Sequence, residues 1–188
     1  MPTLITLAPG WLDAVTAAVD AAAPGPAGNR LIAVDGFSGA GKSTRAAELA
    51  GHLGAPLLEI EDLYPGWHGL GHAPGLARDG IGEPLARGRT LRWTSWDWAH
   101  DRPGQVRERA PAPVVVLEGC GAGGLALAEV TSLLIWIDAD DDVREARLHA
   151  RPDWPGYAPF RDTWRRQELE LAVRARTPQR ADVVLVDP

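Results

Sequence analysis

Short apolar runs alternate along this chain with longer stretches in which apolar residues recur every three or four positions. Short runs rich in Val, Ile and Leu are typical of strands buried on both faces of a parallel sheet. Five such runs predict strands 1 to 5 in chain order, at 31–34, 57–60, 113–117, 133–137 and 181–186. The helical period predicts helices at 11–23, 44–53, 83–89, 125–130 and 160–176. This alternation indicates an α/β fold with helices on both faces of the sheet.

The first predicted strand runs directly into a glycine-rich stretch, Gly36-Phe-Ser-Gly-Ala-Gly-Lys-Ser43, and then into a predicted helix. The stretch fits G-x-x-x-x-G-K-[ST], the phosphate-binding P-loop, in the strand–loop–helix order that the motif requires. Glycines there permit positive φ angles and let backbone N–H groups approach phosphate oxygens closely. The residues predicted to bind nucleotide are Gly36, Ser38, Gly39, Ala40, Gly41, Lys42, Ser43 and Thr44. The alternative is an ordinary glycine-rich turn that matches by chance.

Two side chains of this motif carry its chemistry. Lys42 would reach the β- and γ-phosphates, and the Ser43 hydroxyl would bind Mg²⁺. Lys42 is the only lysine among the 19 lysine and arginine residues of the chain. A compact ammonium fits a cradle of backbone amides where a broad guanidinium does not, so this position has a reason to resist replacement by arginine.

Composition limits the classes of protein that remain. A length of 188 residues predicts a single domain, 1–188, in which 1–30 form a leading helix and loop. The net charge of −6 argues against a nucleic-acid partner, and no apolar run is long enough for a membrane span. Cys120 is the only cysteine, so an internal disulfide is excluded and a reducing, cytoplasmic compartment is expected. The sequence does not indicate the oligomeric state.

Acidic residues follow two of the predicted strands. Asp62 comes shortly after strand 2, and Glu118 follows strand 3. Ligands of open α/β sheets bind outside the carboxyl ends of the strands, so both acids are expected near the phosphates. Asp62 could accept the proton of a substrate hydroxyl and help to place Mg²⁺, and Glu118 could hold Mg²⁺ through a water molecule. For Asp62, a solvated acid at a strand end is the alternative.

Aromatic residues gather between strands 2 and 3. The segment 92–102 contains Trp96, Asp97 and Arg102, which could form the wall of a pocket for the phosphoryl acceptor. The alternative is that its tryptophans fill the core beneath a lid. The glycine-rich segment 65–82 is predicted to be a loop, and its two histidines are expected to be solvated because no third metal ligand accompanies them.

A basic helix is expected after the acids that follow strand 4. Arg144, Arg147 and Arg151 are spaced so that they lie roughly on one helical face. Segment 140–157 would then be a lid that brings arginines to the transferring phosphoryl group. A solvated basic face is the alternative.

These residues together resemble the uridine kinase-like group of small-molecule kinases, which is related to the nucleoside monophosphate kinases. The resemblance lies in 35–44, in Glu61-Asp62-Leu-Tyr64, in Leu117-Glu-Gly119, in the arginine-bearing helix and in 181–186. It implies a three-layer P-loop NTPase fold, and we predict a five-stranded parallel sheet in the order 2-3-1-4-5.

The resemblance also implies roles for individual residues. Asp62 would be the catalytic base, Arg147 and Arg151 would be the lid arginines, and Tyr64 belongs to the Asp-x-Tyr element. Trp96 and Asp97 are similar to the aromatic-Asp-aromatic element that precedes a His and an Arg, here Arg102, in the nucleoside site. The chain is shorter than typical uridine kinases, which leaves little room for the hairpin that covers their substrate.

The sequence therefore predicts a kinase that uses ATP and Mg²⁺ to phosphorylate a hydroxyl of a small molecule such as a nucleoside. Two alternatives remain. One is a kinase for another small acceptor, such as a sugar acid, a vitamin precursor or an antibiotic. The other is a regulatory protein that binds nucleotide without catalysis. The proposed base and the arginine lid favour an enzyme, because a binding protein needs neither.

Overall fold

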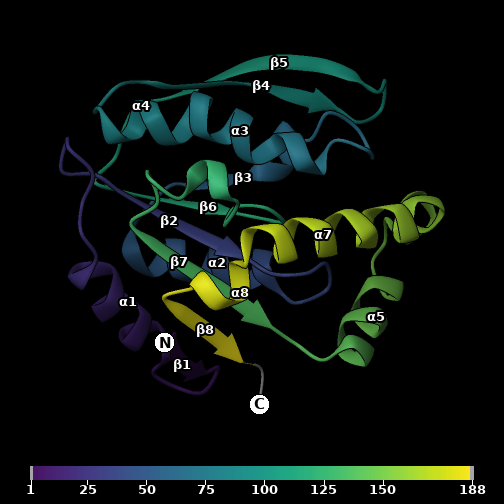
Figure 1. The fold of residues 1–188 in the computed structure, drawn as a ribbon, viewed down its shortest axis with the longest axis horizontal. Coiled ribbons are helices and arrows are strands. Elements are labelled where there is room, and N and C mark those ends of the chain that lie inside the picture. The colour runs from purple at the N-terminus through teal and green to yellow at the C-terminus, as the bar shows by residue number, and fades with distance from the viewer. Residues whose placement is uncertain (1, 187–188) are drawn as a thin grey trace.

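The computed structural model describes residues 2–186, which contain a six-stranded parallel sheet (Figure 1). The strands follow one another in the order β1-β8-β7-β2-β6-β3, and every neighbouring pair is parallel. Their bounds are β1 (Thr3–Thr6), β2 (Arg30–Asp35), β3 (Leu57–Glu59), β6 (Val114–Glu118), β7 (Leu133–Asp138) and β8 (Val183–Val186). The central strand β2 is the one that leads into the glycine-rich loop.

The prediction of a five-stranded sheet was wrong, because Thr3–Thr6 adds the edge strand β1 beside β8. β3, β6, β2, β7 and β8 are the strands that the apolar runs predicted, and β1 extends the sheet beyond them. Most of β1 is exposed, so it has no buried apolar run to reveal it. Its hydrogen bonds to β8 define it, and these depend on residues about 180 positions away in the sequence.

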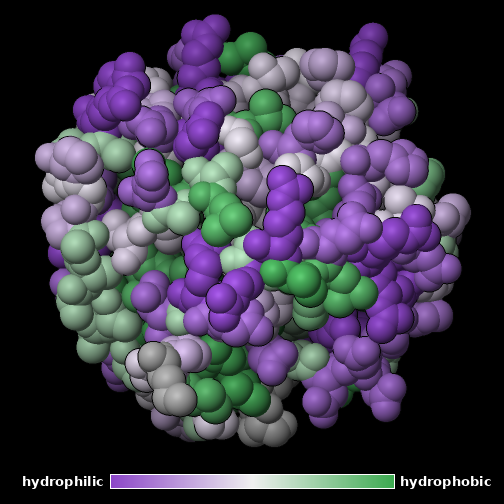
Figure 2. Space-filling view, in the orientation of Figure 1, coloured by the Kyte–Doolittle hydropathy of each residue, from purple (hydrophilic) through white to green (hydrophobic). Residues whose placement is uncertain are grey.

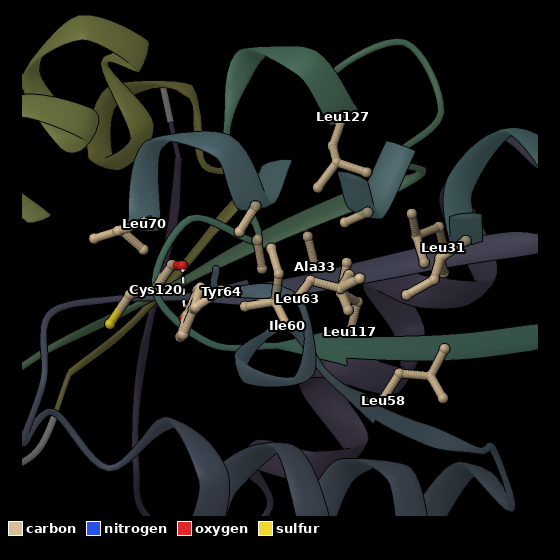
Figure 3. Packing of buried hydrophobic residues seen from close by; sticks show 14 of the residues in the cluster. Leu31, Ala33, Leu58, Ile60, Leu63, Tyr64, Leu70, Leu117, Cys120 and Leu127 are labelled. Atoms are coloured by element: carbon tan, nitrogen blue, oxygen red, sulfur yellow. Dashed lines mark hydrogen bonds between the residues drawn. The ribbon is translucent and has the colours of Figure 1, made fainter. Parts of the chain in front are cut away.

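Two hydrophobic cores lie on opposite faces of the sheet, because successive side chains of a strand point in opposite directions. In β2, Ile32 and Val34 face the core beneath α1 (Trp11–Ala21) and α2 (Lys42–Leu53). Leu31 and Ala33 face the other core, where they pack with Leu58, Ile60 and Leu117 (Figure 3). Helices thus cover both faces of the sheet and give a three-layer arrangement.

The second core lies beneath several short elements that the sequence predicted only in part. Segment 65–82, expected to be a loop, contains α3 (Ala73–Ala77) and a π-helical turn (Arg78–Gly82). The prediction failed because Ala73, Ala77 and Ile81 are fully buried, and this packing outweighs the glycines of the segment. A 3-10 turn (Leu70–His72) precedes α3, and α4 (Glu83–Ala86) follows the π-helical turn.

A two-stranded antiparallel hairpin, β4 (Leu91–Asp97) with β5 (Arg102–Arg109), lies over these short helices (Figure 1). The expectation that the chain leaves little room for a hairpin was therefore wrong. Leu91, Trp93 and Ser95 are buried and alternate with exposed residues, as expected for a strand with one covered face.

The chain beyond β7 returns across the second core. It forms α5 (Asp141–His149), α6 (Trp154–Tyr157), α7 (Arg161–Ala175) and α8 (Thr177–Arg180), with a 3-10 turn (Ala158–Phe160) before α7. Two further 3-10 turns follow β3 (Ile60–Leu63) and the loop after β6 (Leu125–Leu127). Among residues 2–186, no helix has the length and hydrophobicity that crossing a membrane requires. Figure 2 shows hydrophobic side chains in scattered groups on a largely hydrophilic face.

Candidate functional site

The glycine-rich loop connects the end of β2 to the start of α2 and lies against α5. Gly39 has a φ of +82°, and a Cβ there would collide with the backbone carbonyl of Arg144. A Cβ at Gly36, where φ is +154°, would lie 2.6 Å from the carbonyl oxygen of Ile137. Glycine is therefore required at both positions for the backbone to approach its neighbours. The loop has the strand–loop–helix geometry that the sequence predicted.

Lys42 is the first residue of α2 and is only 8 % exposed. Its Nζ donates a hydrogen bond to the backbone carbonyl of Phe37, at 3.0 Å, so the side chain folds back over the loop. Burial alone would lower the pKa of Lys42, but the pKa lies above its usual value because Cys120 and the carboxyl groups of Glu168, Glu118 and Asp35 surround it. Lys42 therefore carries a positive charge at the centre of the loop.

Ser43 and Glu118 come together beside Lys42. The Ser43 hydroxyl donates to Glu118 Oε1 at 2.9 Å, while the buried Glu118 Oε2 has no hydrogen-bond partner among the described residues. Burial raises the pKa of Glu118, although Lys42 and Ser43 oppose the shift. A hydroxyl and a carboxylate with an unpartnered oxygen are the donors that Mg²⁺ prefers, so these residues fit the ion. No cluster of three or more acidic, histidine or cysteine ligands forms within residues 2–186.

A cavity of about 480 Å³ opens beside the loop. Ser38, Gly39, Gly41, Lys42, Ser43 and Thr44 line one side of it. Aromatic side chains also line it, including both tyrosines of the chain: Tyr64, Trp67, Trp98, Tyr157 and Trp164. Besides Lys42, the charged residues of the lining are Glu61, Glu118, Arg147, Arg151 and Asp153. The cavity therefore joins a phosphate-binding loop to an aromatic compartment.

The aromatic side of the cavity is built from four separate segments. Trp67 stacks on Phe160, with ring centroids 4.6 Å apart and planes within 4° of parallel, and its ring lies 4.9 Å from that of Trp98. The Tyr64 hydroxyl donates to the backbone carbonyl of Cys120 at 2.9 Å (Figure 3). Burial raises the pKa of Tyr157 to about 12, which keeps its hydroxyl protonated. These contacts fix aromatic faces around the open space.

Asp62, the predicted base, does not face this cavity. Its carboxylate accepts a hydrogen bond from Trp93 Nε1 at 3.0 Å and pairs with Arg107, both in the hairpin. Glu61, one residue earlier in the same 3-10 turn, lines the cavity instead. The sequence analysis missed Glu61, because both residues are acids and only the direction of each side chain in the turn distinguishes them.

Glu61 lies among charges of both signs. Burial raises its pKa above the usual range, Arg151 opposes the shift, and the carboxylates of Glu59, Asp153 and Asp62 add to it. A carboxylate with a raised pKa is a stronger base than an ordinary one. Glu61 is thus an acid that lines the same cavity as the loop and the aromatic side chains.

The other predicted substrate residues are divided between two places. Tyr64 lines the cavity, whereas Trp96, Asp97 and Arg102 do not. Trp96 lines a separate hollow of about 470 Å³ between the hairpin and α3, and Asp97 binds His100 at 2.8 Å and lies 3.7 Å from Arg102. Trp98, which follows Asp97, lines the cavity. The tryptophan that contacts the cavity is therefore two positions later than the predicted Trp96.

The arginines of α5 and the segment after it have different surroundings. Arg144 is buried over the ring of Phe37 and donates to the Ser38 carbonyl at 3.2 Å, so it supports the loop from beneath. Arg147 lines the cavity, with Nη1 3.4 Å from the Ala40 carbonyl oxygen. Arg151 also lines the cavity and binds Asp153 through two hydrogen bonds, of 2.8 and 2.5 Å. The structure therefore brings Arg147 and Arg151 to the site predicted for them.

Glu168 is a further buried acid that the sequence analysis missed. It belongs to α7, is 5 % exposed, and its Oε1 accepts hydrogen bonds from the Ser38 backbone N–H at 2.9 Å and the Ser38 hydroxyl at 2.6 Å. The Cys120 thiol donates to the same oxygen, and burial raises the pKa of that thiol. Glu168 stands in a helical pattern in which a polar residue usually faces solvent, so no local signal marks it.

Known structures share this fold. A protein from Bacillus stearothermophilus, provisionally described as a uridine kinase, superposes with a TM-score of 0.68 at 15 % identity, over 93 % of this chain and 96 % of its own. One from Silicibacter sp. TM1040, provisionally described as a fructose transport system kinase, gives 0.55 at 22 % identity, over 92 % and 96 %. The fold is that of the P-loop kinases.

A shikimate kinase from Acinetobacter baumannii, solved with shikimate, has the same P-loop kinase fold, with a TM-score of 0.50 at 16 % identity over 83 % of this chain and 82 % of its own. No family model matches the sequence. The comparison with curated proteins gives no significant match. The assignment of the P-loop kinase fold thus rests on structural similarity, and the resemblance of the sequence to uridine kinase-like proteins agrees with it.

Proposed function

We propose that this chain is an ATP- and Mg²⁺-dependent kinase that transfers the γ-phosphoryl group to a hydroxyl of a small, uncharged, ring-containing molecule such as a nucleoside. The observation that carries the proposal is the single cavity that joins Lys42 and Ser43 of the loop to the carboxylate of Glu61 and to an aromatic compartment. A protein that only binds nucleotide needs neither the carboxylate nor the compartment. The chain would act as one domain, with 140–157 as its lid, in the cytoplasm where ATP is available.

The residues around the cavity would divide the reaction between them. The acceptor hydroxyl attacks the γ-phosphorus, its proton passes to the Glu61 carboxylate, and the bond to the β–γ bridging oxygen breaks to release ADP. Lys42 would bind the β- and γ-phosphates, and Arg147 and Arg151 would stabilise the charge of the transferring group. Ser43 and, through water, Glu118 would hold Mg²⁺, which supplies further neutralisation of phosphate charge when bound.

The charges on the acceptor side favour an uncharged acceptor. The Glu61 carboxylate that would accept the proton must lie close to the acceptor hydroxyl, so it would repel a carboxylate or phosphate group on the acceptor. The aromatic side chains that line the cavity instead suit a flat base or a sugar ring. Among the acceptor classes that the sequence left open, a sugar acid therefore fits least well.

An acceptor panel tests the proposal directly. Purified protein would be incubated with Mg²⁺-ATP and with uridine, cytidine, fructose or shikimate, and phosphorylated product would be measured by mass spectrometry. We expect transfer to an uncharged compound that exceeds hydrolysis of ATP by water, and little transfer to shikimate, which is an acid. ATP binding without transfer to any acceptor, and without hydrolysis, would instead identify a nucleotide-binding regulator.

A further inference from the structure

Asp62 is tied to the hairpin by two side chains from facing strands. Trp93 Nε1 donates to Asp62 Oδ2 at 3.0 Å, and Arg107 Nε lies 3.2 Å from the same oxygen. Trp93 and Arg107 are directly opposite one another in the β4–β5 register, so they extend from the same face of the hairpin. A carboxylate held by both strands is fixed in direction relative to the whole hairpin.

The contact of Asp62 with the hairpin connects two chain segments that each supply a residue to the cavity beside the P-loop, Glu61 and Trp98. On one side, Asp62 adjoins Glu61 in a 3-10 turn that Ile60 and Leu63 anchor in the core. On the other side, β4 ends at Asp97, and the next residue, Trp98, enters the cavity. The Asp62 carboxylate therefore links the turn that carries Glu61 to the strand that leads to Trp98.

A second contact seats the hairpin but does not orient it. At Gly80, in the π-helical turn, a Cβ would lie 2.7 Å from the Arg92 carbonyl oxygen and 3.2 Å from Trp93 Cβ. This close packing sets how near the hairpin lies, but van der Waals contact has little directionality. The hydrogen bond and ion pair to Asp62 are directional, so they restrict how β4 points toward the cavity more than the packing at Gly80 does.

We propose that Asp62 is a positioning residue. By binding Trp93 and Arg107, it holds the hairpin against the 3-10 turn in what we call the clamp, and this fixes the position of Trp98 relative to the Glu61 carboxylate. The proposal rests on the proposed function, and it assigns Asp62 no part in moving the proton. Small errors in the placement of reacting groups reduce rates strongly, and a displacement of 1 Å can cost about 10²-fold. The clamp would thus act on acceptor binding and alignment, and not on ATP.

The surroundings of the two partners predict unequal effects. Trp93 is 9 % exposed, so loss of its hydrogen bond to a charged group in Trp93→Phe should raise the KM of the acceptor by about 10-fold. The Arg107 side chain is 57 % exposed, so Arg107→Gln should raise it by only about threefold. Asp62→Asn keeps an oxygen for Trp93 and loses the ion pair, so it should behave like Arg107→Gln.

The experiment measures kcat and KM for the best acceptor of the panel, together with ATP affinity by calorimetry and thermal unfolding, in each variant. Glu108→Gln is the matched control, because Glu108 pairs with Arg92 on the opposite, exposed face of the same hairpin. We expect the acceptor KM to rise in the order given, with unchanged ATP affinity and an unchanged control. Should Trp93→Phe fail to fold, the surface variant Arg107→Gln still decides.

Two results from the variants would overturn the proposal. A fall of about 10²-fold or more in kcat for Asp62→Asn, with Arg107→Gln unchanged, would make Asp62 the base itself. Unchanged acceptor kinetics in folded Trp93→Phe and Arg107→Gln would mean that the clamp positions nothing. A wild-type protein that phosphorylates no compound of the panel has no acceptor to align, so that result would refute the positioning role even where ATP is hydrolysed by water. A wild-type protein that neither transfers nor hydrolyses ATP would refute the proposed function, and the positioning role with it.

Discussion

Replacing Glu61 by Gln should abolish most of the phosphoryl transfer while leaving the fold in place. Glutamine has the shape of glutamate, so the cavity and its aromatic wall should keep their form. It cannot accept a proton from the acceptor hydroxyl at neutral pH. Glu61→Gln therefore removes basicity and little else, provided that Glu61 is the proton acceptor.

The size of the effect follows from what else lies in the cavity. Glu118 is engaged with Ser43, and Asp153 is engaged with Arg151, so neither carboxylate is placed to replace Glu61. Loss of a positioned general base costs about 10²- to 10⁴-fold in rate. The lower end corresponds to about 2.7 kcal/mol in the activation free energy. We expect kcat to fall by at least about 10²-fold, with little change in the KM for ATP.

The dependence of kcat on pH gives a second, independent readout. Because burial raises the pKa of Glu61, the folded protein should lose activity as the pH falls through a value above the ordinary pKa of 4.5. Above that value the carboxylate is ionised and can accept a proton. In Glu61→Gln, the residual activity should no longer show this acidic limb.

Single-turnover transfer to the best acceptor is the appropriate assay, because it isolates chemistry from product release. Thermal unfolding would confirm that the variant is folded. Glu108→Gln is the control, because Glu108 pairs with Arg92 on the exposed face of the hairpin and does not line the cavity. Full single-turnover activity in folded Glu61→Gln would refute its assignment as the base.

Three further changes test the loop and the arginines. Lys42→Ala should weaken ATP binding by about 10-fold or more, because a buried charge-assisted contact to phosphate is lost. Calorimetric titration would measure the affinity, and an unchanged value would exclude phosphate binding by Lys42. Arg147→Ala and Arg151→Ala should each lower kcat by about 10²-fold or more and change the KM for ATP less, which steady-state kinetics would measure. A near-normal kcat in both variants would mean that these arginines form a solvated basic face and do not stabilise the transferring group. Gly39→Ala should destabilise the protein by more than about 1 kcal/mol in chemical unfolding, because its Cβ collides with the Arg144 carbonyl; unchanged stability would show that the loop relaxes freely.

Local sequence carried enough information for the buried strands and the glycine-rich loop. Apolar runs such as 113–117 and 133–137 identify strands because both of their faces are covered, which leaves no polar alternation. The loop is identified because glycine is the only residue that its backbone allows at Gly39. In these cases, the physical requirement and the residues that meet it lie within a few positions of one another.

The parts that the sequence did not predict depend on distant contacts. β1 exists through its pairing with β8, and α3 through burial of its alanines in the second core. Within the site, the opposite directions of Glu61 and Asp62 depend on the hairpin that binds Asp62. Likewise, Glu168 reaches Ser38 across 130 positions of sequence. Such side-chain directions are set by packing partners, which local pattern does not specify.

The close approach of the loop to α5 has a consequence for motion. The Gly39 backbone packs against Arg144, and the Arg144 guanidinium lies over Phe37 and binds the Ser38 carbonyl, so α5 cannot lift away from the loop without losing these contacts. Opening of the segment expected as a lid should therefore hinge beyond His149, where the chain leaves α5 and leads to α6. Amide hydrogens of α5 should exchange with solvent only when the loop also opens, so bound nucleotide would slow exchange in a helix whose amides it does not contact.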